Sequence, residues 1–435
     1  MKTLLNKFNR PDSILVVTSY PSRGNGVSDR TAVAWHSKRI LRELAKQGSH
    51  IIVLAEKTGN AAFDDVISRD GKNIIVLRTW QKGSITSMAQ IAKAALKFDQ
   101  VHQVLFQFEF NVFGGIAPVA AVPALLTFLR LIGKTITFEL HQVITDISRI
   151  SNHINIKNVY ALKGFNIALH LFYKAIGALS KQIVVLETQL KQQLGAYIDA
   201  AKINVVPLAV ASTKTLTKAN ARKVLGISKK DFVIVSFGFV NWYKGSDWIT
   251  KTISRTKSRG IKLLLAGGES STLKNKAYYQ KFYKDTVRVA TKSNKVIHTD
   301  FIPEKYINRY FAASDVVVFP YRVFMSSSGP LTHALMHQKP VLFSTNLQQY
   351  FQNDDVRVAL QKSDLKYTDI MFDLDSRNFM QKIKLVRKSP ESFVEFSRLL
   401  GQSRLISDVA KRYTKILTST PPTLFPLFKI LFTDK

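Results

Sequence analysis

Short apolar runs alternate with amphipathic stretches along almost the whole chain. In the first half, runs with the length and β-branched content of buried strands lie at 13–20, 50–56, 73–80, 101–110, 134–143, 182–188 and 203–209. Between several of them, apolar residues recur every three or four positions, which predicts helices at 32–48, 86–98, 116–132 and 157–180. Apolar strands that alternate with helices are typical of a parallel sheet with helices on both faces.

The same alternation begins again after a polar, Thr- and Lys-rich segment at 210–223. Strands are predicted at 231–239, 261–268, 296–302, 315–321 and 340–345, and helices at 245–259, 275–291, 303–313, 330–338, 376–388 and 391–417. We therefore expect an α/β protein with two Rossmann-like, doubly wound parallel-sheet domains, residues 1–210 and 211–400, facing a central cleft. Residues 401–435 are expected to form a C-terminal helix and an apolar tail that pack back toward the first domain or lie on a membrane.

The charge of the chain narrows the classes of partner. The 435 residues include 63 Lys and Arg against 30 Asp and Glu, a net charge of +33. Such an excess favours an anionic partner: nucleic acid, a membrane surface or a phosphorylated ligand. The basic residues are spread over helices and linkers without a recognised nucleic-acid-binding motif, so nucleic acid is the least favoured of the three. The absence of cysteine excludes disulfides and cysteine-based sites.

No segment has the pattern of a targeting or membrane-spanning sequence. The residues before Ser13 lack the apolar core of a signal peptide, which predicts a cytoplasmic protein. The uncharged stretch 110–129 contains Pro118 and Pro123, which favours a buried turn and helix over a membrane span. Two apolar, lysine-containing segments, 158–182 and 421–435, fit either packing within the fold or peripheral attachment to an anionic leaflet.

The common metal and hydrolase motifs are absent or better explained otherwise. The sequence has no P-loop and no GxSxG. Asp373 and Asp375 have the spacing of a metal-binding pair, but they stand before a predicted helix, which favours a turn with an N-cap. The nine histidines are scattered without the spacing of metal ligands, so no metal site is predicted.

Two strand ends of the second domain carry features suited to an anionic, hydroxyl-rich ligand. Lys244 precedes Gly245 at the start of a helix, where an ammonium and free backbone N–H groups can together neutralise a phosphate. A second strand leads to another helix start, with Pro330 in its first turn. The hydroxyl and backbone donors there are Ser326, Ser327, Ser328 and Gly329. A capped helix would explain the serines alone, but their recurrence with Lys244 favours a ligand site.

The order of these segments resembles a known family. FGFVNWYKG, LLLAGG, FIPEKYINRYFAASDVVVFPY and SSGPLTHALMHQKPVLFST are similar to the C-terminal half of the retaining, family-four GT-B glycosyltransferases. QFEFNVFGG, ITFELHQV, VVLETQLKQQL and INVVPLAV are similar to the N-terminal domain of that group. The resemblance, which runs from about Ser13 to Leu417, implies a nucleotide-sugar donor on the C-terminal domain and an acceptor on the N-terminal one. It also implies transfer with retention of configuration, without a metal or other cofactor.

The resemblance assigns the donor-side residues position by position. Lys244 falls on the lysine that contacts the donor diphosphate, whereas Phe239 stands where an arginine is often found. Met325 and His333 occupy the two positions of the family's Glu-x(7)-Glu pair. His333 can still bond a ribose hydroxyl, but Met325 cannot replace a carboxylate, so contacts to the sugar would come from residues 326–329. A variant donor pocket is the preferred interpretation, and a weakly active or non-catalytic homologue is the alternative.

The acceptor side rests on two strand ends and one loop. His141 occupies the family's position in FELHQV, where it either bonds a group near the reacting sugar or is a satisfied strand-end histidine. Glu109 in QFEF either binds acceptor hydroxyls or pairs with a nearby base. The loop Gly24-Asn25-Gly26 lacks the third glycine of GxGxxG, so it is predicted to approach the donor phosphates or the acceptor through its backbone.

The sequence therefore predicts a glycosyltransferase that moves a hexosyl group from a nucleotide sugar to a saccharide or lipid-linked acceptor. No paired carboxylates are recognised at strand ends, which argues against double displacement. Instead, the leaving diphosphate can take the acceptor proton while Lys244 and the helix start at 326–329 stabilise it. Two other classes stay open: a GT-B phosphorylase or synthase acting on sugar phosphates, and a basic nucleic-acid-binding protein.

Overall fold

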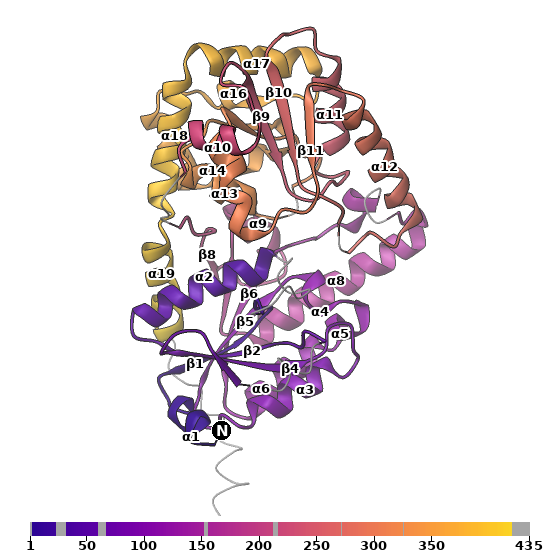
Figure 1. The fold of residues 1–435 in the computed structure, drawn as a ribbon. Coiled ribbons are helices and arrows are strands. Elements are labelled where there is room, and N and C mark those ends of the chain that lie inside the picture. Colours follow the sequence, from indigo (N-terminus) through magenta and orange to yellow (C-terminus); the bar gives the residue numbers. More distant parts are fainter. Residues whose placement is uncertain are drawn as a thin grey trace, which may run out of the picture. The chain divides into compact units, whose positions relative to one another are not determined.

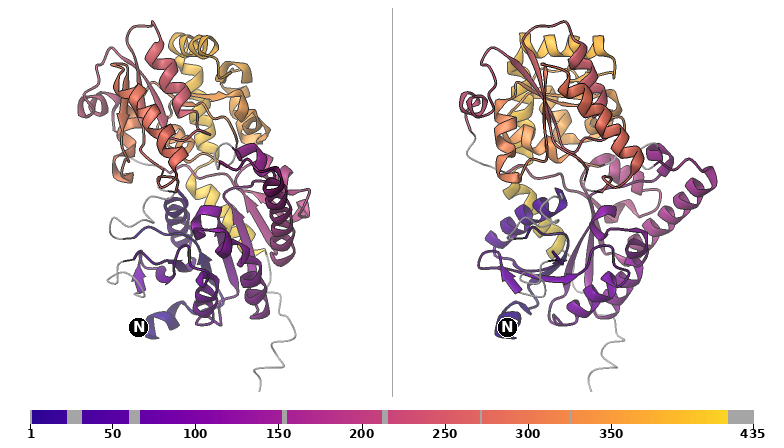
Figure 2. Two further views of the ribbon diagram at one scale, coloured as in Figure 1. Left: turned by 90° about the vertical axis from the view of Figure 1, so that its right-hand side faces the viewer. Right: turned by 45° about the vertical axis from the view of Figure 1, so that its right-hand side comes forward.

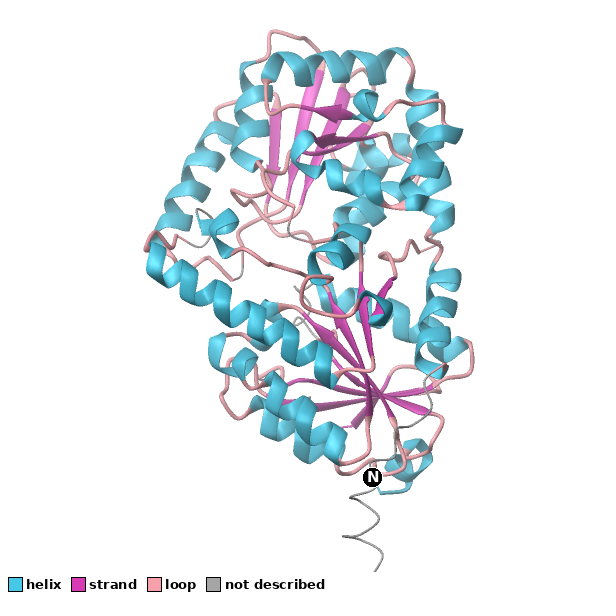
Figure 3. Ribbon diagram, turned by 180° about the vertical axis from the view of Figure 1, so that it is seen from behind, coloured by secondary structure: helices cyan, strands magenta, loops and turns pink. Residues whose placement is uncertain are grey.

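The computed structural model describes residues 2–22, 32–59, 67–151, 155–211, 216–270, 272–324 and 326–419. The chain divides into two compact units, each with its own parallel sheet (Figure 1). Unit 1 comprises Met1–Thr145, Lys163–Ala209 and Ile406–Lys435, and unit 2 comprises Asp146–Leu162 and Val210–Leu405. In each unit, helices cover both faces of the sheet, which confirms the predicted fold class (Figure 3).

The described part of unit 1 contains an eight-stranded sheet in the order β3-β4-β2-β1-β5-β6-β7-β8. Its strands are β1 (Ser13–Val17), β2 (His50–Glu56), β3 (Ile67–Arg69), β4 (Ile74–Trp80), β5 (Gln103–Phe108), β6 (Thr135–Leu140), β7 (Gln182–Val185) and β8 (Ile203–Val205). Only the pairing of β3 with β4 is antiparallel among these strands. The sequence predicted the parallel strands but not the short edge strand β3.

Most helices of unit 1 lie in the connections between strands, whereas α1 precedes β1 and α19 comes from the C-terminal part of the chain. They are α1 (Lys2–Phe8), α2 (Ala32–Lys46), α3 (Ser87–Ala95), α4 (Phe110–Phe113), α5 (Ile116–Ala120), α6 (Val122–Leu131), α8 (Val159–Leu179, which begins in unit 2), α9 (Thr188–Leu194), the 3₁₀ turn η3 (Ala200–Lys202) and α19 (Ile406–Thr418). The single helix predicted at 116–132 is divided, because Pro123 in the first turn of α6 cannot continue α5. In the described residues, no helix combines the length and the apolar character that crossing a membrane requires.

Unit 2 has a six-stranded, fully parallel sheet in the order β11-β10-β9-β12-β13-β14. Its strands are β9 (Phe232–Phe237), β10 (Ile261–Ala266), β11 (Val296–Thr299), β12 (Val316–Phe319), β13 (Val341–Ser344) and β14 (Met371–Phe372). Its helices are η2 (Ile147–Ile150), α10 (Lys218–Val224), α11 (Ser246–Arg255), α12 (Ala277–Thr291), α13 (Glu304–Ala313), α14 (Gly329–Met336), η4 (Thr345–Gln352), α15 (Asp354–Lys362), α16 (Tyr367–Ile370), α17 (Ser376–Lys388) and α18 (Pro390–Ser403). Asp375 caps α17 by accepting from the Asn378 N–H, which confirms the predicted N-cap.

The helix predicted at 391–417 is in fact two helices, α18 and α19, separated at Arg404 and Leu405. Arg404 is 1% exposed and forms an ion pair with Asp355, while its carbonyl accepts from the Val210 N–H. These contacts with remote residues replace helical hydrogen bonding at this point, so the helix is interrupted. Beyond the break, α19 packs against α2 in unit 1, where the yellow C-terminal helix is seen in both views of Figure 2.

Candidate functional site

Glycines bring three strand ends of unit 2 into close backbone contact. Gly238 follows β9 and Gly267 follows β10, both with positive φ angles, of 112° and 151°. A Cβ at Gly267 would collide with the Gly238 carbonyl oxygen, and one at Gly268 would lie 2.6 Å from the Phe301 nitrogen, beyond β11. Only residues without a side chain fit here, so the carboxyl ends of β9, β10 and β11 offer an edge made largely of backbone.

Lys244 lies on the loop that connects β9 to α11. Its Nζ is so close to Gly238 that a Cβ there would collide with it, and it lies 5.8 Å from the ring centre of Tyr321. The Arg322 N–H donates to the Tyr243 carbonyl over 2.7 Å, which ties this loop to the segment after β12. The ammonium is therefore held at the carboxyl edge of the sheet, where parallel α/β folds bind ligands.

The Lys244 ammonium lacks a counter-ion in the described part of the chain. The residue is partly exposed, yet burial of its ammonium lowers its pKa from 10.5 to about 8. No ion pair between Lys244 and a carboxylate is formed by the described residues. A cation kept without a partner in such a place is suited to an anionic ligand.

The second predicted donor segment approaches Lys244 through Tyr321. Ser328 precedes α14, makes no side-chain cap, and its Oγ lies 3.2 Å from the Tyr321 hydroxyl. A Cβ at Gly329 would have no atom within 4 Å, so the first turn of α14 faces open space. Lys244, Tyr321 and Ser328 thus lie along one edge. The ligand-binding role of Ser326, Ser327, Ser328 and Gly329 stays a prediction. Met325 lies outside the described residues.

His333 lies one turn into α14 and is 8% exposed. Its ring stacks on Phe311 at 5.3 Å between centroids and lies 6.3 Å from the ring of Phe237, the last residue of β9. The imidazole therefore packs beneath the strand end that precedes Gly238.

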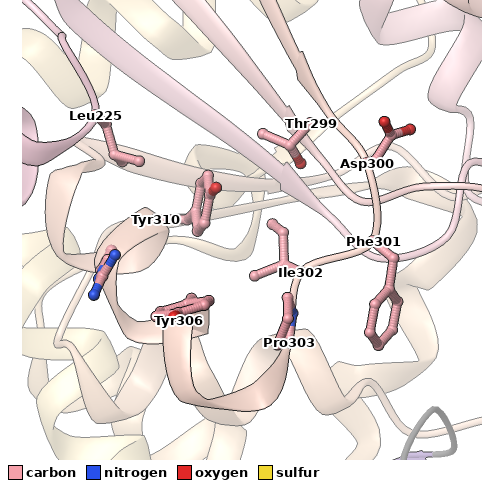
Figure 4. Close-up of a pocket in the computed structure, with 9 residues that line it drawn as sticks. Leu225, Thr299, Asp300, Phe301, Ile302, Pro303, Tyr306 and Tyr310 are labelled. Atoms are coloured by element: carbon pink, nitrogen blue, oxygen red, sulfur yellow. The ribbon is translucent and has the colours of Figure 1, made fainter. Parts of the chain in front are cut away.

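A small pocket continues this edge at the end of β11 (Figure 4). Its volume is about 170 Å³, and it is lined by Leu225, Thr299, Asp300, Phe301, Ile302, Pro303, Tyr306, Arg309 and Tyr310. The Gly267 N–H donates to Thr299 Oγ1, which connects the pocket to the glycine edge. Phe239, which replaces the family's arginine, stacks on Phe301 at 6.5 Å. This end of the edge is therefore aromatic where the resemblance implies a charge.

In unit 1, the two predicted acceptor residues are neighbours in the sheet. His141 directly follows β6, and its N–H donates to the carbonyl of Phe108, the residue before Glu109. Burial raises the pKa of Glu109, while His141, Lys82 and a hydrogen bond from Asn111 oppose that rise. The structure therefore places His141 and Glu109 in one electrostatic environment at the ends of β5 and β6.

Gly24, Asn25 and Gly26 lie outside the described residues, so their role in donor binding stays a prediction. The chain before them is firmly held: Ser19 donates to Glu56, and Arg78 donates to the Tyr20 carbonyl over 2.8 Å.

Two histidines that are far apart in the sequence meet in the structure. His36 on α2 and His141 after β6 both contact the carboxylate of Glu139 on β6, and all three side chains are at least nine-tenths buried. Burial alone would raise the pKa of Glu139, but His141 and His36 hold it well below its usual range. Burial lowers the pKa of His36, partly offset by Glu139. The sequence offered one sign of this cluster: Glu139 is a charged residue inside the otherwise apolar run ITFEL.

Buried carboxylates at strand ends were also missed from the sequence. Glu56 ends β2, Glu139 lies near the end of β6 and Glu187 follows β7, and each is at most 5% exposed. Together with Glu109 they place four carboxylates along the carboxyl edge of unit 1, where Arg78 lies 4.0 Å from Glu56.

Comparison with known proteins agrees with this geometry. Residues 231–364 match the family model described as glycosyl transferases group 1. No curated protein sequence matches the chain. Three similar solved structures, at 12–13% identity, are sucrose-phosphate synthase from Thermosynechococcus elongatus, HepE from Anabaena in complex with UDP-glucose, and WaaG, a glycosyltransferase of lipopolysaccharide biosynthesis.

These structures resemble the chain over nearly its whole length. Sucrose-phosphate synthase has a TM-score of 0.70 at 13% identity and covers 93% of this chain and 98% of its own. HepE has a TM-score of 0.64 and WaaG one of 0.63, both at 12% identity, covering 94% of this chain and all of theirs. The chain therefore has a GT-B fold, and residues 231–364 in its second unit are similar to group 1 glycosyl transferases.

Proposed function

We propose that this protein is a glycosyltransferase that moves a hexosyl group from a nucleotide sugar to a saccharide or lipid-linked acceptor. The observation that carries the proposal is Lys244, whose ammonium has no counter-ion among the described residues and lies at the backbone edge of β9, inside the segment that matches the group 1 model. HepE, which shares the fold, was solved with UDP-glucose, and this supports a nucleotide-sugar donor.

On the donor side, Lys244 would neutralise the diphosphate together with the N–H groups at the start of α14. The open space at Gly329 admits a ligand close to the backbone, and Ser326 and Ser327 supply further donors. His333 is assigned to a ribose hydroxyl. Because Lys244 and backbone dipoles supply the positive potential, the transfer requires no metal ion at the diphosphate and no cofactor beyond the co-substrate.

On the acceptor side, His141 and Glu109 would bind the attacking hydroxyl. In a front-face mechanism, the oxygen of the departing diphosphate takes the hydroxyl proton, and the new glycosidic bond forms on the face that the leaving group vacates. The configuration at the anomeric carbon is then retained. The protein's part is to hold both reactants in place and to stabilise the charge on the departing phosphate.

A panel of nucleotide sugars tested by thermal shift would identify the donor. One base and sugar combination is expected to raise the melting temperature, because a ligand at 100 times its Kd stabilises the folded state by about 2.7 kcal/mol. The matched nucleoside monophosphate, which lacks the diphosphate, should stabilise the protein less. The proposal fails if no nucleotide sugar stabilises the chain and no glycosyl transfer to sugar or lipid acceptors is detected.

We also propose that the protein attaches to the inner face of the membrane through α8. The exposed face of this helix is apolar: Tyr160 is 84% exposed, Ile167 60% and Leu171 62%. Exposed Lys163 and Lys174 lie on the same helix, which contains no Asp or Glu. Apolar side chains flanked by lysines are suited to the interface of an anionic bilayer, where the chain's charge of +33 adds long-range attraction. The apolar tail at 421–435 lies outside the described residues.

Vesicle flotation tests the α8 surface. The wild-type chain is expected to float with vesicles that contain phosphatidylglycerol, and to float less at high salt. The double variant Ile167→Glu/Leu171→Glu should lose most of this binding, because two carboxylates would enter the apolar interface. Leu96→Glu alters another leucine, 56% exposed, and serves as the control. Equal flotation of the double variant and the wild type would contradict the role of α8.

A further inference from the structure

One side chain of α2 and two side chains at the end of β6 converge on one buried point in unit 1. Nε2 of His36 lies 3.3 Å from Oε1 of Glu139, and Nε2 of His141 lies 2.9 Å from the same oxygen. The two imidazole rings are nearly perpendicular, with centroids 4.9 Å apart. The side chains of His36, Glu139 and His141 are 10%, 0% and 7% exposed. The cluster therefore connects α2 with the end of β6.

Hydrogen bonds between described residues do not satisfy this cluster. Both Nε2 atoms and the shared Oε1 are buried, and none of them makes a hydrogen bond of acceptable angle within the described part of the chain, in spite of the short separations. Buried polar atoms are nearly always bonded, and a group of them left unsatisfied indicates an ion or a water. Because the atoms here are two imidazole nitrogens and a carboxylate oxygen, they match the ligand set of a divalent metal.

Two of the three separations have the length expected for ligands to one ion, and all three ligand atoms lie within 4.8 Å of one another. Two atoms that are each about 2.0–2.1 Å from a zinc ion, at angles of about 90–110°, lie about 2.9–3.4 Å apart. The observed separations of 2.9 and 3.3 Å fall in this range.

Hydrogen bonds from neighbouring side chains fix the orientation of the Glu139 carboxylate, as they do for carboxylates that bind metals. Gln107 Nε2 donates to Glu139 Oε2 over 2.9 Å, and Ser37 Oγ donates to Gln107 Oε1 over 2.6 Å. Such outer hydrogen bonds commonly fix ligating carboxylates. Among the described residues, no lysine or arginine pairs with Glu139, so a bound cation would also neutralise its buried charge.

We propose that His36, Glu139 and His141 bind one divalent transition-metal ion of the zinc type. The role of His141 toward the acceptor rests on the proposed function, but the metal site does not. The ion belongs to unit 1, whereas the donor diphosphate is assigned to Lys244 in unit 2.

Zn²⁺ and Co²⁺ added to chelator-treated full-length protein test the site. We expect one equivalent of Zn²⁺ by calorimetry and mass spectrometry, and visible absorption of four- or five-coordinate Co²⁺. His36→Ala and Glu139→Gln should each weaken Zn²⁺ binding at least 100-fold. His170→Gln is the matched control, because His170 is a partly buried histidine of the same unit that contacts the Tyr197 hydroxyl at 3.0 Å instead of a carboxylate.

Two results would overturn the metal site. One is the absence of stoichiometric Zn²⁺ and Co²⁺ binding by the wild-type chain, a measurement that needs no variant to fold. The other is binding that persists unchanged in both His36→Ala and Glu139→Gln when circular dichroism shows the fold intact. UDP-glucose binding, measured on the same samples, reports separately on the proposed function, since the donor is assigned to unit 2.

Discussion

Replacing Lys244 with alanine is expected to lower the rate of glycosyl transfer by about 10- to 100-fold, the cost of losing one charge-assisted contact to the departing phosphate. The fold should stay intact, because the described residues form no ion pair with Lys244 and it touches mainly Gly238 and the rings of Tyr243 and Tyr321. The measurement is the turnover of the identified donor and acceptor at saturation. Lys244→Met keeps the approximate length of the side chain but not its charge, and it should lower the rate of transfer by a similar factor.

The pKa of Lys244 gives this assignment a pH signature. With a pKa of about 8 in the free protein, the ammonium is charged at pH 7, and donor affinity should fall about tenfold per unit as the pH rises above 8. The free energy of unfolding should rise between pH 8 and 10.5. In this range the unfolded chain still carries the charged ammonium, whereas the folded state has lost the proton that burial disfavours.

Lys244→Arg is the control for this signature, since a guanidinium stays charged over the whole range. If Arg supports binding, its affinity should not fall between pH 8 and 10. Turnover that is unchanged in Lys244→Ala, or the same pH dependence in Lys244→Met as in the wild type, would show that another group holds the diphosphate.

Gly245→Ala is expected to destabilise the protein by about 3 kcal/mol or more. Gly245 has φ of 67°, and a Cβ there would collide with the Pro320 carbonyl oxygen, so the cost of a left-handed residue is joined by a clash between two backbone segments. The displaced loop carries Lys244, so donor affinity should fall as well. Chemical denaturation of the purified variant measures the first effect.

Gly226 offers a matched control for that substitution. Its φ of 66° is nearly the same, but a Cβ there would meet no atom within 4 Å. Gly226→Ala should therefore cost only about 1 kcal/mol, the conformational penalty alone. Similar losses of stability in the two variants would mean that the close approach of Gly245 to Pro320 does not determine the conformation of the loop.

Most strands of both sheets were predictable because they are largely apolar runs, and a parallel sheet buried on both faces requires that pattern. The short edge strands β3 and β14 were not predicted. Lys244 and the start of α14 could be recognised because strand ends and helix starts are local in sequence. The break at Arg404 could not, since it depends on Asp355 and Val210, which are remote in the chain. The cluster of His36, Glu139 and His141 was not predicted for the same reason, because about 100 residues separate His36 from the other two side chains in the sequence.

The C-terminal helix α19 completes the core of unit 1. Val409, Ala410, Tyr413 and Leu417 are at most 2% exposed and pack in one cluster with Ile40, Leu41 and Leu44 of α2. A ribosome therefore releases most of unit 1 long before the residues that close its core, whereas nearly all of unit 2 comes from the single stretch Val210–Leu405. During synthesis, unit 2 can therefore reach its final packing before unit 1, although most of unit 1 is synthesised earlier.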